Sequence, residues 1–212
     1  MICKYNVKSP SLPNGRKTDL SVVIFSYFCL MLSERKNAIR GTVIETASRL
    51  FYKQGYGNTG INQIIEESGV VKSSVYTAFR TKEDILMAYL ETTGAATDKA
   101  LQAAADQSNT PKERVLSVFD YLIRMVQGKE YYGCQFLNII SEIPPEAERV
   151  IKQIQKQKNG VRSLFARILE PIGKQDLADE IYVLFEGALA ANKVHHEVWP
   201  VEAAKKIASK IL

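Results

Sequence analysis

Apolar residues recur at steps of three and four along most of this chain, which is the spacing of amphipathic helices. No run shows the alternation of apolar and polar residues that is typical of strands, and no internal repeat is present. The pattern therefore predicts an all-α fold of about nine helices. Glycine and proline residues mark their ends. The expected helices cover residues 33–54, 61–68, 72–79, 82–105, 111–127, 131–142, 146–169, 176–196 and 200–212.

The stretch from Thr59 to Lys82 holds two short helices on either side of Gly69. A glycine can end the first helix in a left-handed conformation at no steric cost. In the second, Val75 and Phe79 are four residues apart and are expected to face inward. A short helix, a glycine turn and a second helix with a polar outer face form a helix-turn-helix, whose second helix enters the DNA major groove. That outer face carries Lys72, Ser73, Tyr76 and Thr77.

The segment Gly69-Val-Val-Lys-Ser-Ser-Val-Tyr-Thr-Ala-Phe-Arg-Thr-Lys-Glu-Asp-Ile-Leu86 resembles the TetR-type transcriptional regulators in order and spacing. The preceding segment Arg49-Leu-Phe-Tyr-Lys-Gln-Gly-Tyr56 is similar to the family as well. Two positions depart from the family pattern. Val71 replaces a serine that caps the recognition helix, and Ala78 replaces a tyrosine or histidine that contacts DNA. These departures bear on which DNA sequence is bound.

The resemblance implies a role for each polar residue of the motif. Lys72 and Thr77 would read base edges, and Tyr76 and Lys82 would contact phosphates. The N-terminal amides of the first motif helix would bind another phosphate through the helix dipole. Phosphate contacts set affinity and register, whereas base contacts set the sequence that is read. The expected DNA-binding set is Thr59, Gly60, Lys72, Ser73, Ser74, Tyr76, Thr77 and Lys82.

The last two predicted helices carry a candidate dimer interface. Small residues at four-residue spacing in Gly187-Ala-Leu-Ala-Ala191 permit close approach of another helix. The resemblance implies that these helices pair between two subunits, which gives a homodimer on a palindromic operator. Packing inside a single chain is the alternative interpretation of the same residues. The interface set is Ile181, Leu184, Gly187, Ala188 and Ala191.

Residues 85–193 are expected to enclose an apolar effector pocket with a few polar groups, the usual character of a small-molecule site. Each proposed lining residue could equally be part of the core. The candidates are Tyr89, Phe119, Tyr121, Met125, Phe136, Asn138 and Phe165.

Cys134 is a separate candidate for redox sensing. The spacing Gly133-Cys134-x-x-x-Asn138-x-x-x-Glu142 resembles a stretch of some TetR-type regulators that sense electrophiles or oxidants through a cysteine. The same resemblance pairs Cys134 with Lys193, and a nearby lysine would favour the reactive thiolate. A buried and inert cysteine is the alternative.

Composition narrows the class of protein further. The 212 residues carry a net charge of +5, and residues 31–90 hold eight basic and six acidic side chains. The small positive charge of this segment is expected if a few lysine or arginine side chains contact phosphates at specific positions. Three cysteines do not form a disulfide framework, which indicates a reducing cytoplasm. No cofactor, metal or catalytic signature is recognisable, and His195 and His196 are adjacent and so do not share a helix face.

Residues 1–30 differ from the rest of the chain. Residues 9–15 have the composition of turns, and residues 20–32 form an apolar run that is shorter than a bilayer span. We expect a disordered extension or a translation start at Met31. A signal-peptide core and a membrane tether are the alternatives, although no cleavage site follows the run.

The expected organisation is a helix-turn-helix domain at residues 31–80 and a helical ligand-binding and dimerisation domain at residues 81–212. The resemblance implies a cytoplasmic repressor that a small-molecule or electrophilic effector releases from its operator. Effector binding would shift the helix at residues 82–105 and change the spacing of the two recognition helices. A membrane-tethered helical protein and a thiol-dependent enzyme are the alternative functions.

Overall fold

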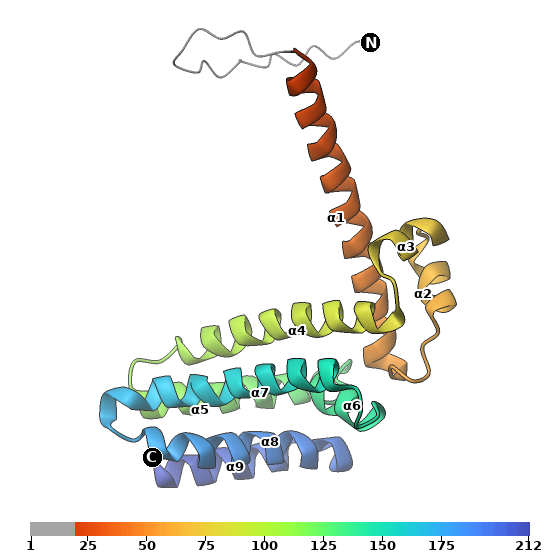
Figure 1. The fold of residues 1–212 in the computed structure, drawn as a ribbon. Coiled ribbons are helices and arrows are strands. Elements are labelled where there is room, and N and C mark those ends of the chain that lie inside the picture. The colour runs from red at the N-terminus through yellow and green to blue at the C-terminus, as the bar shows by residue number, and fades with distance from the viewer. Residues whose placement is uncertain (1–19) are drawn as a thin grey trace, which may run out of the picture. The chain divides into compact units, whose positions relative to one another are not determined.

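The computed structural model describes the backbone from residue 20 to residue 212 and the side chains from residue 34 onwards (Figure 1). Over this range the chain forms nine α-helices and two short 3₁₀-helices, and it contains no strand. The all-α prediction is confirmed. The prediction of a disordered extension at residues 1–30 lies outside the described residues as far as residue 19, and from Leu20 onwards the backbone is helical instead.

Helix α1 (Leu20–Gln54) begins earlier than the predicted residue 33. No glycine or proline occurs between Leu20 and Gly41, so the helical hydrogen bonds continue through the apolar run. The chain divides into two units between Ala38 and Ile39. A membrane tether is one alternative interpretation of the apolar run at residues 20–32. Among the described residues, no helix is both long and apolar enough to cross a membrane.

Helices α2 (Ile61–Ser68) and α3 (Lys72–Ala78) form the helix-turn-helix with the C-terminal part of α1. The two helices have almost the predicted bounds. Gly69 ends α2 with φ 64°, a left-handed conformation that glycine adopts without strain. Their small core is continuous with the start of α4. It includes Val43, Leu50, Phe51, Ile64, Val75, Phe79, Ile85 and Tyr89.

Helix α4 (Lys82–Ala105) contributes to both hydrophobic cores of the second unit. Its N-terminus carries a capping box, because the Thr81 hydroxyl accepts from the Asp84 amide at 3.1 Å and the Asp84 carboxylate accepts from the Thr81 amide. Arg149 donates to Asp84 at 2.8 Å and is the main cause of the lowered pKa of that carboxyl. Leu86 packs in the helix-turn-helix core and Leu101 in the second core.

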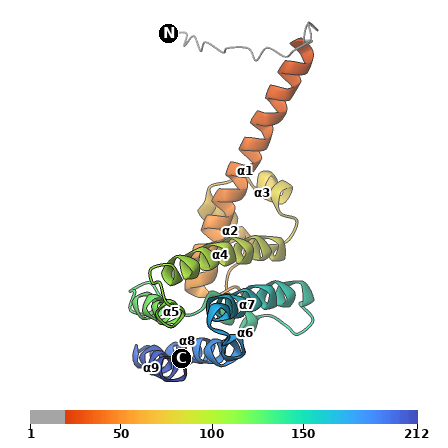
Figure 2. The same ribbon diagram turned by 90° about the vertical axis from the view of Figure 1, so that its left-hand side faces the viewer.

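The remaining helices are α5 (Pro111–Val126), α6 (Gln135–Glu142), α7 (Glu148–Leu169), α8 (Ala178–His195) and α9 (Trp199–Ile211); the name larger domain is used for α4–α9 together. The 3₁₀-helices Glu170–Ile172 and Gln175–Leu177 connect α7 to α8. Helix α8 packs along α9, and α5 contacts both α4 and α9 (Figure 2). Helix α6 starts later than predicted, since Gly133 has φ 98° and interrupts helical geometry.

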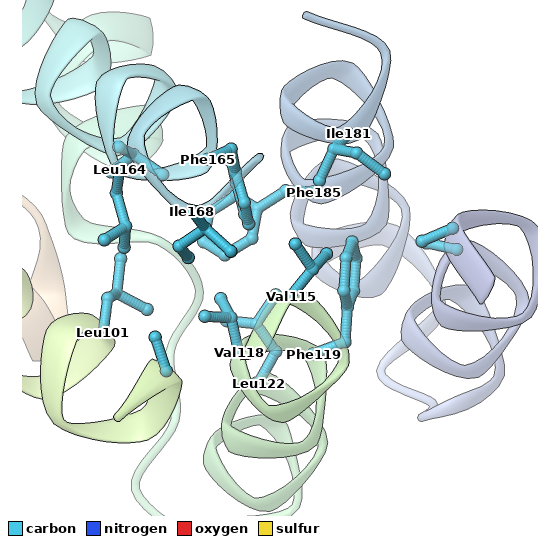
Figure 3. Close-up of a cluster of buried hydrophobic side chains, with 14 of the residues drawn as sticks. Leu101, Val115, Val118, Phe119, Leu122, Leu164, Phe165, Ile168, Ile181 and Phe185 are labelled. Atoms are coloured by element: carbon cyan, nitrogen blue, oxygen red, sulfur yellow. The ribbon is translucent and has the colours of Figure 1, made fainter. Parts of the chain in front are cut away.

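Three phenylalanine rings lie at the centre of the larger domain, one each from α5, α7 and α8 (Figure 3). The ring centroids of Phe165 and Phe185 are 5.7 Å apart, and Phe119 lies 6.4 Å from Phe165. All three are buried. Such aromatic contacts add to the free energy gained by apolar burial, so these helices form one packed unit.

Candidate functional site

The exposed face of α3 carries four polar side chains with no role in the core. Lys72, Ser73, Tyr76 and Thr77 are exposed, whereas Val75 is fully buried on the opposite face. The Thr77 hydroxyl donates to the Ser73 carbonyl at 2.8 Å. Ser74 is half-buried and Gly60 is exposed at the start of α2. The start of α3 lacks a side-chain cap because Val71 occupies the capping position.

Lys82, for which a phosphate contact is predicted, is held by the helix-turn-helix itself. Its ammonium donates to the carbonyls of Tyr56 and Thr59, at 3.0 Å each, and lies 4.1 Å from the centroid of the Tyr56 ring. Burial lowers the pKa of Lys82, and the Glu142 carboxylate opposes this shift. Thr59 is fully buried, and its hydroxyl donates to the Gly55 carbonyl. These two side chains therefore stabilise the turn between α1 and α2.

We expect Lys82→Met to lower the free energy of unfolding by about 2 kcal/mol, because two carbonyls lose a charged donor and the ring loses its cation. Lys72→Met makes the same chemical change on the exposed face of α3 and should cost less than about 0.5 kcal/mol. Urea unfolding followed by circular dichroism measures both. Equal losses in the two variants would contradict the structural role of Lys82.

Arg40 also stabilises the recognition helix, a role that the sequence did not indicate. Its guanidinium donates to the Ala78 carbonyl at 2.9 Å and lies 4.4 Å from the centroid of the Phe79 ring. The carbonyls in the last turn of a helix have no partners within that helix, so an external donor satisfies one of them. Because 38 residues separate Arg40 from Ala78, no local sequence pattern reveals the contact.

The larger domain contains a cavity of about 580 Å³ between α4, α5, α6, α7 and α8. Of the predicted lining residues, Tyr121, Met125 and Phe136 line this cavity. Four others do not, which corrects the prediction. Phe119 and Phe165 pack in the aromatic core, Tyr89 packs against Phe51, and Asn138 donates to the Tyr132 carbonyl beside a second hollow. The lining also includes Tyr52, Thr93, Tyr131, Cys134, Gln157 and Lys158.

Cys134 lies at the wall of this cavity, immediately before α6. The ammonium of Lys158 donates to its sulfur at 3.4 Å and to the Glu186 carboxylate at 2.7 Å. Burial works to lower the pKa of Lys158, but Cys134 and Glu186 outweigh it and raise that pKa. Lys193 instead donates to the Tyr132 carbonyl at 2.8 Å. The lysine beside the thiol is therefore Lys158, which corrects the predicted pairing with Lys193.

Tyr131 adds a buried polar group to the same wall. Its hydroxyl is buried and has no hydrogen-bond partner among the described residues. Burial is the main cause of its raised pKa, so the phenol stays protonated. A buried hydroxyl without a partner is costly, and a ligand or water that reached it would gain a hydrogen bond.

The predicted dimer set divides between the interior and the surface of this chain. Ile181 and Ala188 are buried within the chain's own core, where Figure 3 shows Ile181 beside Phe185. Their assignment to a partner interface is therefore corrected. Leu184 and Ala191 are half-buried, and Gly187 is exposed. The exposed stripe of α8 consists of Val183, Gly187, Ala190 and Val194, with Trp199 and Ile207 exposed on α9.

These features define a protein with a helix-turn-helix and, among the helices that follow it, a cavity. Residues 43–89 match the sequence model described as bacterial regulatory proteins, tetR family. An HTH-type regulator of Bacillus subtilis, YxaF, is 40% identical over 77 residues, which cover 36% of this chain and 40% of that relative. The repressor NemR of Escherichia coli is 24% identical over 178 residues, which cover 78% and 89% of the two chains.

Solved structures share the fold. NemR in its reduced form superimposes with a TM-score of 0.74 at 22% identity, covering 81% of this chain and 95% of NemR. A TetR-family regulator from Streptomyces coelicolor gives 0.71 at 24% identity, covering 81% and 90%. Residues 43–89 thus carry the helix-turn-helix of the TetR family, and the chain is similar over most of its length to transcriptional regulators of that family. The comparisons give no support to a membrane-tethered protein or a thiol-dependent enzyme.

Proposed function

We propose that this chain is a cytoplasmic, homodimeric repressor whose α3 reads a palindromic operator. The observation that carries this proposal is the exposed polar face of α3 within a stretch that matches the family over residues 43–89. Lys72 is the first residue of α3, and the N-terminal residues of a recognition helix are those that contact base edges. Ser73, Tyr76 and Thr77 share the same exposed face and would complete the contacts to bases and phosphates.

The dimer would form through the exposed apolar stripe of α8 and the adjoining residues of α9. Val183 and Val194 are 65% and 72% exposed, and Gly187 and Ala190 lie between them at helical spacing. Small residues permit a second helix to approach closely, and the two valines would supply apolar area. A two-fold symmetric pair would present two copies of α3 to adjacent major grooves.

Val183→Asp combined with Val194→Asp should convert the dimer to a monomer, because each aspartate would be buried without a partner in the interface. Sedimentation-velocity ultracentrifugation measures the change as a halving of mass at micromolar concentration. Val71→Asp is the matched control, since Val71 is 69% exposed but lies at the start of α3. An unchanged mass in the double variant would contradict this interface.

The cavity would bind the effector, either reversibly or through Cys134. Its volume of about 580 Å³ suits a small molecule, and its walls combine apolar and polar side chains. The Lys158 ammonium lies 3.4 Å from the sulfur and places a positive charge beside the nucleophilic atom. A quinone is an electrophile that such a thiol would attack. The thiolate would form a carbon–sulfur bond to the ring, and the displaced electron pair would move to the quinone oxygen, which takes up a proton. The structure of NemR in a reduced form supports testing this thiol.

Repression would end by a shift between two conformations. Effector binding in the cavity would move α4, which contributes to both cores, and change the separation of the two recognition helices. The resulting coupling free energy is expected to be about 1–3 kcal/mol, as in other allosteric proteins.

A gel-shift with the DNA upstream of the chain's own coding region tests this function. The wild-type protein should bind this DNA specifically. Addition of 1,4-benzoquinone should release the wild-type protein from the DNA but leave the Cys134→Ser variant bound. Release of both proteins would exclude Cys134 as the sensor, whereas release of neither would favour a reversible ligand. If the folded dimer bound neither this fragment nor any genomic fragment specifically, the proposed repressor function would be wrong.

A further inference from the structure

The wall of the cavity includes a residue of the DNA-binding domain itself. Tyr52 belongs to α1, and its neighbours Leu50 and Phe51 are buried in the helix-turn-helix core. The Tyr52 side chain nevertheless lines the cavity. Its hydroxyl accepts a hydrogen bond from the Tyr132 amide at 3.0 Å, and the two rings meet edge to face at 5.3 Å. A molecule in the cavity would therefore be within reach of α1 directly, without α4 as an intermediary.

Helix α6 makes a second connection between the cavity and the helix-turn-helix. Cys134 lies at its N-terminal end in the cavity wall. Phe136 in the first turn of the helix and Ile139 in its middle are buried in the same cluster as the core of the helix-turn-helix. Glu142 is the last residue of α6. Its carboxylate accepts a hydrogen bond of 2.7 Å from the amide of Gly57, which lies 85 residues earlier in the turn between α1 and α2.

The turn between α1 and α2 is shaped to receive this carboxylate. Gly55 has φ 91°, and a Cβ atom there would lie 3.0 Å from both carboxylate oxygens of Glu142. Lys82, which binds the same turn through the carbonyls of Tyr56 and Thr59, is close enough for Glu142 to affect its pKa. The Glu142 carboxylate thus binds an amide of this turn, and the Lys82 ammonium binds two of its carbonyls. That turn fixes how α2 leaves α1.

We propose that Tyr52 and Glu142 are positioning residues through which α6 transmits occupation of the cavity to the helix-turn-helix. This inference rests on the proposed effector function. Eight residues of helix span roughly 12 Å and move as a rigid rod. Cys134, Gln135 and Phe136 at the start of α6 line the cavity, so a molecule that occupies it presses against this end of the helix and displaces α6. The displacement withdraws Glu142 from Gly57 and releases the turn.

The contact has the properties that a switch requires. A charge-assisted hydrogen bond is strong enough to fix the turn while it is formed. Glu142 and Gly57 are both exposed, so water replaces each partner when they separate and neither group is left buried without a bond. The contact therefore breaks without unfolding the domain, whereas the buried contacts of Phe136 and Ile139 keep α6 attached.

Hydrogen–deuterium exchange tests this transmission without DNA. The chain would carry Cys3→Ser and Cys29→Ser, and Cys134 would be labelled with N-ethylmaleimide, with the adduct located by mass spectrometry. The peptide that contains Gly57 should then exchange roughly tenfold faster, as expected for loss of a charge-assisted hydrogen bond. Cys134→Phe supplies similar bulk without chemistry and should give the same increase, so the test does not depend on thiol reactivity.

Two control variants distinguish a specific effect of Cys134 labelling on the Glu142–Gly57 contact from a general destabilisation of the protein. Glu142→Ala should exchange fast at this peptide before labelling and show no further increase. Glu146→Ala removes an exposed glutamate just beyond α6 and should behave as wild type. An unchanged turn in the verified adduct and in folded Cys134→Phe would overturn the inference. If quinone still released DNA, the repressor function would stand and transmission would run through α4.

Discussion

Lys72→Ala should lower affinity for the cognate operator by about 10- to 100-fold, the range expected for loss of one base contact. Binding to DNA of unrelated sequence should fall far less, because phosphate contacts supply most of that affinity. The reason lies in the position of Lys72, which is exposed at the first turn of α3 and has no role in the core. Fluorescence anisotropy on operator and scrambled duplexes measures the ratio of the two affinities.

Tyr76→Phe is the informative comparison, since it removes only a hydroxyl from the same face of α3. If that hydroxyl meets a phosphate, binding should weaken by a similar factor on every sequence, and the ratio of affinities should stay constant. An equal loss for Lys72→Ala on both duplexes would instead make Lys72 a backbone contact.

Lys158→Met should lower the free energy of unfolding by about 2 kcal/mol, because Glu186 is left without its counter-charge. Breaking a fully buried pair costs more, about 3–5 kcal/mol, but the two side chains here retain 14% and 18% exposure. The double variant Lys158→Met with Glu186→Leu should recover most of the loss, since no unpaired charge remains. Urea unfolding of the two variants and of wild type gives both differences.

A second ion pair on α7 provides the control for this experiment. Lys152 pairs with Glu148 one turn away at 2.9 Å, and both side chains are largely exposed. Lys152→Met should therefore cost less than about 0.5 kcal/mol. If Lys158→Met were no more harmful than Lys152→Met, the interior pair would not contribute as its burial indicates.

The sequence predicted the helices well where local signals determine them. Helix α2 has the predicted bounds because an isoleucine stripe precedes Gly69, and α4 begins at a capping threonine. The start of α1 was wrong by 13 residues, since the apolar run at residues 20–32 was interpreted as separate from the helix. Helix α6 was predicted too long because Gly133 was not recognised as a break.

The functional residues were harder to predict because their roles depend on distant contacts. Lys82 matches a family motif, but the motif does not reveal that its ammonium donates to the carbonyls of Tyr56 and Thr59. The lysine beside Cys134 is 24 residues away on α7, and neither spacing nor composition singles out Lys158. Periodicity identified Phe119 as inward-facing but could not distinguish a cavity wall from a solid core.

Selection of genomic DNA fragments by the purified protein is the measurement that tests the central claim most directly. Wild type should enrich a small set of fragments that share an inverted repeat, with half-sites about one helical turn apart. The Lys72→Ala variant should lose that enrichment while still binding DNA weakly. Recovery of fragments without a shared sequence, or the same set with both proteins, would contradict sequence-specific recognition by α3.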